Sequence, residues 1–176
     1  GIGYSEDDRV YIAPALTFSP TADTDFTLLT SYSKRDGSTS HGIPYLSGID
    51  SETYLGEPDF DNMDTIERNI GYEFRHNFGN GFEFRQNARY TDLDLTYEGV
   101  FAPYAAAAGT AEIEASRSSL AVYGHARRFD IDNQLEYDAS FGRFDSKTLL
   151  GLSYAHDKVS ERRYDGTLAG INPYDV

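Results

Sequence analysis

Hydrophobic and polar residues alternate with a period of two along much of this chain, whereas the spacing of an amphipathic helix is hard to find. This alternation predicts β-strands with one apolar face and one polar face. We expect about six strands, near residues 10–18, 26–33, 69–78, 82–97, 129–141 and 150–154. In the clearest of them Phe129, Ile131, Leu135, Tyr137, Ala139 and Phe141 alternate with Asp130, Asp132, Gln134, Glu136, Asp138 and Ser140.

Local signals predict where these strands are interrupted. Pro14 cannot donate a hydrogen bond to a neighbouring strand, so the first strand is expected at a sheet edge or locally irregular. In GYEFRHNFGNGFEFRQNARY, residues 71–90, the central Gly-Asn-Gly tolerates the positive φ of a tight hairpin turn. After Tyr90 the apolar phase shifts to Leu93, Leu95 and Tyr97, which indicates either a β-bulge or a strand that leaves one environment for another.

The connections between the predicted strands alternate between short and long. Residues 34–67 and 99–117 form two long polar connections, and residues 162–176 are expected to be a further loop. Short turns at one end and long loops at the other are typical of an antiparallel transmembrane β-barrel of the outer membrane. The soluble alternative is a β-sandwich, which would show regular short turns and two hydrophobic inner faces.

A lipid bilayer on one side of the sheet explains why apolar and polar side chains alternate so regularly along a strand. Side chains that face lipid must be apolar or aromatic, whereas the opposite face can be polar because it faces a water-filled or plugged lumen. In the hairpin of residues 71–90 we expect Tyr72, Phe74, Phe78, Phe82 and Phe84 to face lipid, and Glu73, Arg75, Glu83 and Arg85 to face the lumen. Gln86 and His76 fall on the lipid side, where a polar group at mid-membrane is unfavourable.

Composition narrows the classes of function. The chain of 176 residues has 14 Tyr, 11 Phe, no Cys and a formal net charge of −14. So negative a surface repels phosphate, which argues against nucleic acid as a partner. Without cysteine there is neither a disulfide framework nor a thiolate metal site. No apolar run of about 18 residues predicts a membrane helix, and the first residues lack the features of a signal peptide, so we expect a mature form or an internal fragment.

Metal and catalytic motifs do not fit the sequence. The acidic stretch GEPDFDNMD offers Glu57, Asp59, Asp61 and Asp64, but an EF-hand counted from Asp59 would need an oxygen ligand and a glycine where Met63 and Asp64 stand. His41, His76, His125 and His156 lie on separate segments without ligand spacing. No GxSxG or zinc helix motif is present, so we expect no metal and no enzyme; an outer-membrane hydrolase with a dispersed triad is the enzymatic alternative.

Several sequence words, taken in order, resemble one family. IAPALTF, GIPYLSG, LGEPDFDNMD, GYEF, FRQNARY and TLLGLSY, spread over residues 9–158, are similar to the barrel of TonB-dependent siderophore receptors of the ferrichrome and hydroxamate type. The resemblance implies a barrel of 22 strands with an N-terminal plug domain and a TonB-contact motif. Neither of these two parts is found in the sequence. We therefore expect residues 1–176 to be a partial outer-membrane β-barrel domain, an internal fragment of a larger receptor.

The resemblance also implies a function and a location. It implies uptake of a ferric siderophore across the outer membrane of a Gram-negative bacterium, in contact with membrane lipid and energised by the TonB-ExbB-ExbD complex. The siderophore is the transported ligand, its own oxygens hold the iron, and no intrinsic cofactor is expected. Two alternatives stay open at this point: a self-contained small barrel with an adhesive or structural role, and a soluble β-sandwich that binds carbohydrate.

By motif position, the resemblance nominates ligand contacts in the two long connections. HGIPY nominates His41, Ile43 and Tyr45, although related receptors often have an aromatic residue where Ile43 stands. YEGVFAPY nominates Phe101 and Tyr104. Aromatic rings would pack on the organic shell of the siderophore, while hydroxyl and imidazole groups would donate hydrogen bonds. The competing interpretation is that these side chains belong to an interfacial aromatic belt.

Overall fold

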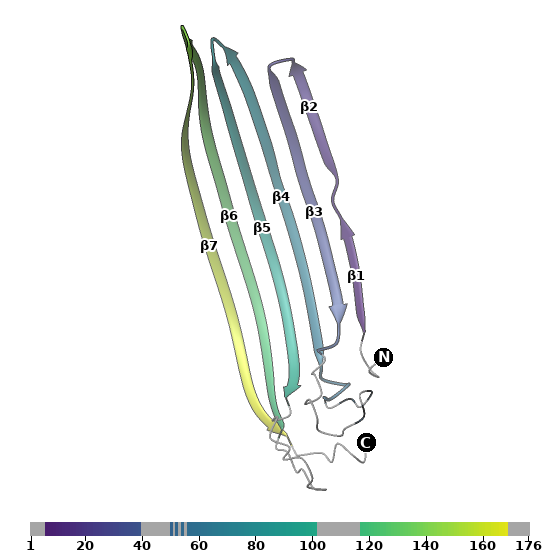
Figure 1. Cartoon of the computed structure of the whole chain (residues 1–176). Helices are drawn as coiled ribbons and strands as arrows, with labels where there is room; N and C mark the ends of the chain where they lie inside the picture. The colour runs from purple at the N-terminus through teal and green to yellow at the C-terminus, as the bar shows by residue number, and fades with distance from the viewer. Residues whose placement is uncertain are drawn as a thin grey trace.

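The computed structural model describes residues 6–39, 50, 52, 54, 56–101 and 117–168, and its regular structure is entirely β-strand. These residues form one antiparallel sheet in the order β1-β3-β4-β5-β6-β7, with β2 also paired to β3 (Figure 1). The strands are β1 (Asp7–Ile12), β2 (Ala15–Thr21), β3 (Thr24–Gly37), β4 (Asn62–Gly79), β5 (Phe82–Phe101), β6 (Arg117–Phe141) and β7 (Phe144–Leu168). The predicted all-β antiparallel class is confirmed.

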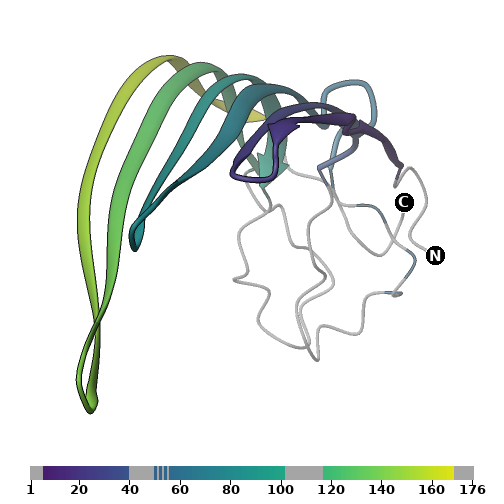
Figure 2. The same ribbon diagram turned by 90° about the horizontal axis from the view of Figure 1, so that it is seen from above.

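The sheet is arched like part of a cylinder wall, and it is open at both edges (Figure 2). Hollows of about 300 to 450 Å³ lie along one side, and their lining includes Asp25, Glu73, Arg75, Asn87, Arg89 and Asp130. We call this concave side the inner face and the opposite side the outer face. No helix in the described part of the chain is long and apolar enough to cross a membrane. A single arched sheet, rather than two packed sheets, does not favour the sandwich alternative.

The first predicted strand is split in two, which raises the strand number from about six to seven. β1 and β2 both pair with β3, and the break between them falls at Ala13 and Pro14. The carbonyl oxygen of Pro14 still accepts a hydrogen bond of 3.1 Å from the backbone N–H of Thr30. The prediction of an irregular edge strand at Pro14 is therefore confirmed, because a proline offers no N–H to the ladder.

Several strands extend beyond their predicted ends. β3 continues to Gly37 and β4 begins at Asn62, so the connection predicted over residues 34–67 covers only 38–61. In the same way β5 and β6 shorten the connection predicted over residues 99–117 to 102–116, and β7 takes residues 162–168 from the predicted terminal loop. These added residues do not alternate regularly between apolar and polar side chains: residues 34–37 have no apolar side chain, whereas 62–67 and 99–101 include Met63, Ile66, Val100 and Phe101 out of phase.

The predicted Gly-Asn-Gly turn joins β4 and β5. Gly79, Asn80 and Gly81 have φ values of 73°, 51° and 86°, the left-handed region that such a turn requires. Gly81 is also fixed by contact, since a Cβ there would lie 2.1 Å from the carbonyl oxygen of Asp138. That close approach accompanies a 2.8 Å hydrogen bond from the Asp138 N–H to the Gly81 carbonyl, which ties the turn to β6.

An apolar belt covers the outer face toward the end with the short turns. Cross-strand pairing aligns its members, which are Leu16, Phe18, Phe26, Leu28, Tyr72, Phe74, Phe84, Ala88, Tyr90, Phe129, Ile131, Leu135, Leu150, Leu152 and Tyr154. On β5 the belt runs from Phe82 to Tyr90, close to the roughly 9 to 11 residues that a tilted strand needs to cross a bilayer. Of the predicted sets of the central hairpin, Tyr72, Phe74 and Phe84 lie on the outer face, and Glu73, Arg75, Glu83 and Arg85 lie on the inner face, as their separation into two faces predicts.

Polar side chains within the belt are hydrogen-bonded to one another. The Tyr72 hydroxyl donates to Gln86 Oε1 at 2.6 Å, and Gln86 Nε2 donates to Asn133 Oδ1 at 2.6 Å. Asn133 Nδ2 in turn donates to the carbonyl oxygen of Leu152 at 3.2 Å. His76 Nδ1 lies 2.8 Å from the Thr24 hydroxyl at the turn end of the sheet. Neither Gln86 nor His76 is therefore left without a partner in an apolar environment.

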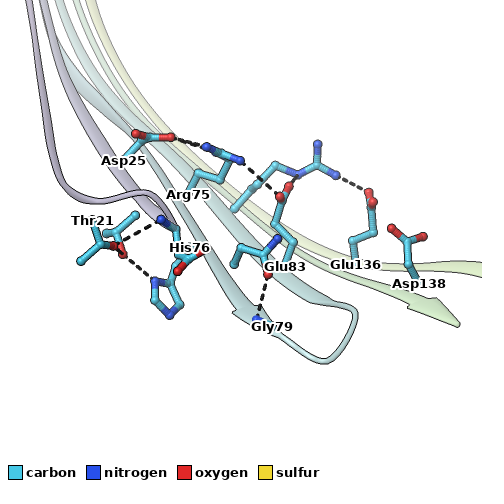
Figure 3. Close-up of polar contacts among 12 residues, drawn as sticks. Thr21, Asp25, Arg75, His76, Gly79, Glu83, Glu136 and Asp138 are labelled. Atoms are coloured by element: carbon cyan, nitrogen blue, oxygen red, sulfur yellow. Dashed lines mark hydrogen bonds and ion pairs between the residues drawn. The ribbon is translucent and has the colours of Figure 1, made fainter.

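The inner face carries a row of charged side chains near the short turns (Figure 3). Arg75 Nε donates to Asp25 at 3.1 Å, and Arg75 also lies 3.5 Å from Glu83. Arg85 continues the row to Glu136 at 2.6 Å, and Lys147 pairs with both Glu136 and Asp138. Acidic and basic side chains thus alternate across β3 to β7. The basic partners compensate the negative charges of Glu136 and Asp138 on β6, which reduces repulsion among the acidic side chains of the inner face.

Candidate functional site

The candidate site is the end of the sheet from which the long connections leave, here called the loop end. There the two faces exchange character: Leu93, Leu95 and Tyr97 of β5 lie on the inner face, beside Met63 of β4 and Val122 of β6. Pairing between β5 and both neighbours continues without a shift through this region. The phase change after Tyr90 is thus no bulge. The strand passes out of the belt, and its inner face becomes apolar as its outer face becomes charged.

The charged outer face at this level centres on an ion cluster formed by Arg68, Asp92, Asp94, His125 and Arg127. Arg68 Nη1 donates to Asp92 at 3.1 Å and to Asp94 at 3.0 Å, and Arg127 Nε donates to Asp92 at 3.2 Å. His125 Nδ1 lies 2.7 Å from Asp94. Such charges are incompatible with hydrocarbon, so the cluster marks where the strands leave the apolar belt.

Pairing of β5 with β6 brings together metal-ligand types that the sequence keeps apart. One ligand atom each from Asp92, Asp94 and His125 lies within 4.8 Å of the others. Both carboxylates are already held by Arg68 or Arg127, so a cation would have to displace these arginines. The arrangement is that of an ion-pair cluster rather than a built metal site.

A buried carboxylate lies at the base of the first long connection. Asp61 is 5% exposed, and it accepts hydrogen bonds from the Val100 N–H at 2.7 Å, the Tyr54 hydroxyl at 2.6 Å and the Glu57 N–H at 2.8 Å. Burial, together with the hydrogen bond to Asp61, raises the pKa of the Tyr54 hydroxyl above its ordinary value of 10.0. Asp61 is thus part of the folded base of the connection, and its oxygens are occupied by protein donors.

A buried cation lies next to it at the start of β6. Arg117 is 5% exposed; its Nη2 lies 2.5 Å from Glu57 Oε1, and its Nη1 donates to the Gly56 carbonyl at 3.3 Å. Thr39 is also buried and donates to the Glu98 carbonyl at 2.7 Å. Of the four residues considered for calcium, Glu57 and Asp61 therefore bind protein groups from β5 and β6.

Of the five nominated ligand contacts, one lies within the described residues. Phe101 is the last residue of β5, at the loop end and next to the buried Val100. His41, Ile43, Tyr45 and Tyr104 lie outside the described residues. Sequence reasoning missed the burial of Asp61 and of Arg117, because only the pairing of distant segments brings their separate partners together. The one available signal was the phase change after Tyr90, which pointed to the inner apolar wall.

The chain is similar in sequence to known outer-membrane receptors. No family model matches the chain. It is 28% identical over 180 residues to the ferrioxamine B receptor of Salmonella typhimurium, covering 97% of this chain and 25% of that protein. It is 26% identical over 200 residues to the ferrichrome outer membrane transporter/phage receptor of Escherichia coli, covering 97% of this chain and 26% of that protein. The chain thus spans about a quarter of the length of these relatives.

Solved structures show the same fold. The ferric-catecholate import receptor Fiu of E. coli K12, in its open form, matches with a TM-score of 0.85 and 15% identity, over 99% of this chain and 30% of that one. At that identity the match shows the fold alone. The expected resemblance to the barrel of siderophore receptors is confirmed. The two curated relatives are a receptor and a transporter by name.

Proposed function

From this resemblance to TonB-dependent siderophore receptors, we propose that the chain forms part of the wall of an outer-membrane receptor for a ferric siderophore in a Gram-negative bacterium. The observation that carries the proposal is similarity to ferrioxamine and ferrichrome receptors along 97% of the chain. The apolar belt supports the membrane location, since its outward side chains suit lipid. Uptake is energised through TonB-ExbB-ExbD, acting on parts of the receptor outside residues 1–176.

The siderophore binds at the loop end, on the lumen side. Leu93 and Leu95 provide an apolar inner wall there. The nominated Phe101 ends β5 at this end, and the nominated His41, Ile43, Tyr45 and Tyr104 belong to the connections that leave it. Such a wall favours the organic shell of a hydroxamate siderophore, whose own oxygens retain the iron. The receptor needs no intrinsic cofactor for this role, because binding and displacement make and break no covalent bond.

The open edges support a place within a larger barrel. β7 has 25 residues and pairs only with β6 in the described part of the chain, so its other edge presents unpaired N–H and C=O groups. A lipid environment does not tolerate such an edge, since no water is present to satisfy these groups. Further strands of the same receptor therefore continue the sheet on the β7 side and on the β1–β2 side.

The test uses the full-length receptor and two iron complexes, those of ferrioxamine B and ferrichrome. We expect equilibrium binding of at least one complex, and iron uptake in cells that depends on TonB. Leu95→Ala and Phe101→Ala should each weaken binding about tenfold, because each removes apolar contact area. Thr96→Ala, the outward-facing neighbour of Leu95, is the matched control. A correctly folded receptor that binds neither complex would overturn the proposal.

A further inference from the structure

A carboxylate lies at the edge of the apolar inner wall. Glu67 of β4 is paired with Leu93 of β5, so the two side chains are neighbours on the inner face. Leu93 and Leu95 form the wall assigned to the organic shell of the siderophore, which makes Glu67 an acidic group beside that wall. Glu67 is half-buried. A partly desolvated carboxylate is unfavourable unless it is hydrogen-bonded or meets a cation.

Polar side chains of three strands hold Glu67 in a defined position. Asn69 Nδ2 donates to Glu67 Oε1 at 2.6 Å and to the Ser31 hydroxyl of β3 at 3.0 Å. The Thr91 hydroxyl of β5 donates to Asn69 Oδ1 at 2.5 Å. The Asn69 amide is therefore fixed at both its nitrogen and its oxygen, and it orients the carboxylate. A carboxylate has about four acceptor positions, so Glu67 can still accept from a donor in the lumen.

The negative charge of Glu67 is not compensated within the described part of the chain. Glu67 forms no ion pair there, and it accepts its hydrogen bond from the neutral Asn69. Arg35 of β3 is on the same face, but it donates from Nε and Nη2 to Asp7 at 2.8 and 3.0 Å. By contrast, Glu136 in the row near the short turns pairs with two cations. Glu67 thus presents a charge that a cationic ligand group can neutralise.

A hollow of about 300 Å³ on the inner face has Glu67 at the end nearest the wall. Gly71 and Arg89 also line it. A Cβ at Gly71 would lie 2.5 Å from the carbonyl oxygen of Ala88, so only glycine fits and no side chain fills the hollow at this position. Arg89 is paired with Gly71, farther from the wall than Glu67. A ligand cation is therefore favoured at the Glu67 end, and the hollow has room for an alkyl arm that carries it.

We propose that Glu67 is a specificity-determining residue, which binds the ammonium group of ferric siderophores that carry a free amine. The organic shell of the same ligand packs on Leu93 and Leu95, and the amine arm enters the hollow beside them. This selectivity rests on the proposed function and names its preferred class of substrate. A siderophore without a cationic group leaves Glu67 uncompensated and binds less tightly.

Ferric ferrioxamine B and its N-acetylated form are a matched pair of probes for this charge. Both have the same iron complex, but acetylation converts the protonated amine into a neutral amide. With the full-length receptor we expect the amine form to bind about fivefold more tightly, the size of a solvent-accessible ion pair. High salt should weaken binding of the amine form selectively, because added ions screen its charge.

Substitution of Glu67 assigns the preference to this residue. Glu67→Gln removes the charge and keeps an oxygen for Asn69, so it should lower affinity for the amine form about fivefold. Its affinity for the acetylated form should be unchanged, which also shows that the variant is folded. Glu67→Asp keeps the charge and should retain a preference for the amine form. Glu73→Gln, which changes an inner-face carboxylate nearer the short turns, is the matched control and should bind both forms as the wild type does.

The outcomes separate amine selection from the receptor function. Equal binding of the two forms by the wild type at low salt would overturn the role of Glu67 while the receptor function stands, and so would binding of ferrichrome alone. A Glu67→Gln receptor that keeps the preference would overturn it as well. If Glu67→Gln does not fold, Glu67→Asp and the salt dependence of the wild type decide. If the wild type binds neither form nor ferrichrome, the proposed function itself fails, and amine selection fails with it.

Discussion

Gln86 of β5 donates a 2.6 Å hydrogen bond to Asn133 of β6 in the middle of the apolar belt. With the Tyr72 hydroxyl and the Leu152 carbonyl, the two amides form a hydrogen-bonded row across four strands. Gln86 and Asn133 are thus hydrogen-bonded to each other although they lie in an apolar region. Amides that face lipid have no water as an alternative partner. The row therefore favours the β4–β7 pairing seen here over a register shifted by one residue, which would separate its members.

Replacing one polar side chain of this row should lower the stability of the receptor, whereas replacing all three should lower it much less. Asn133→Leu leaves the Gln86 amide without its acceptor, and we expect a loss of about 1 to 2 kcal/mol in the free energy of unfolding. The triple variant Tyr72→Phe, Gln86→Leu, Asn133→Leu should recover most of that loss. Denaturant unfolding of the receptor in lipid vesicles measures both, with the lumen-facing Asn87→Leu as control. A triple variant less stable than the single one would refute this account.

The two glycines of the central turn should respond differently to alanine. Gly79 and Gly81 have similar φ values, 73° and 86°, so both substitutions incur left-handed backbone strain of about 1 to 2 kcal/mol. Only at Gly81 does the new Cβ meet an atom, the Asp138 carbonyl oxygen, and nothing lies within 4 Å at Gly79. We expect Gly81→Ala to be clearly more destabilising than Gly79→Ala in vesicle unfolding. Equal effects would mean that β6 gives way at Asp138.

The strands that could be predicted are those whose two faces lie in different solvents. Alternation located the belt portions of β4, β5 and β6 and assigned Phe74 to lipid and Arg75 to the lumen. Where the strands leave the belt, both faces are polar or the apolar face is reversed, and the period-two signal disappears although hydrogen bonding continues. Residues 34–37 and 162–168 were therefore expected in loops for a physical reason: without a bilayer, nothing requires their faces to differ.

The candidate site was less predictable than the fold. Leu93, Leu95 and Tyr97 could be singled out by their phase, but two explanations of the shift remained until the register was known. Asp61 looked like one acidic residue among several in a solvated loop, and its burial depends on Val100, 39 positions away in sequence. Likewise, Asp92, Asp94 and His125 meet only through the pairing of β5 with β6. Local sequence carries no signal for such distant partners.

Two neighbouring acids of β6 should differ in importance for the inner ionic row. Glu136 has a side chain 15% exposed and pairs with Arg85 and Lys147, whereas Asp138 is 54% exposed and, among the described residues, pairs with Lys147 alone. Glu136→Gln should lower stability more than Asp138→Asn does, because Arg85 and Lys147 both lose their shared charged partner. Asp138→Asn should change stability by less than about 1 kcal/mol. Unfolding in vesicles at low and high salt measures both, and a larger effect at Asp138 would contradict the row as described.

The buried contacts of Asp61 should be sensitive to alkaline pH through Tyr54, whose hydroxyl donates to that carboxylate. The folded-state pKa of Tyr54 is raised above 10.0 by burial and by Asp61, so the folded state holds this proton more tightly than the unfolded state does. The contribution to stability is complete below pH 10.0, and is lost as pH rises from there through the folded-state pKa. We expect exchange of the Val100 amide, corrected for its intrinsic pH dependence, to accelerate above that pH. Tyr54→Phe should abolish the alkaline acceleration, whereas Tyr11→Phe, on an exposed ring, should retain it. If the acceleration persists in Tyr54→Phe, a group other than Tyr54 controls the alkaline loss of the Asp61–Val100 contact.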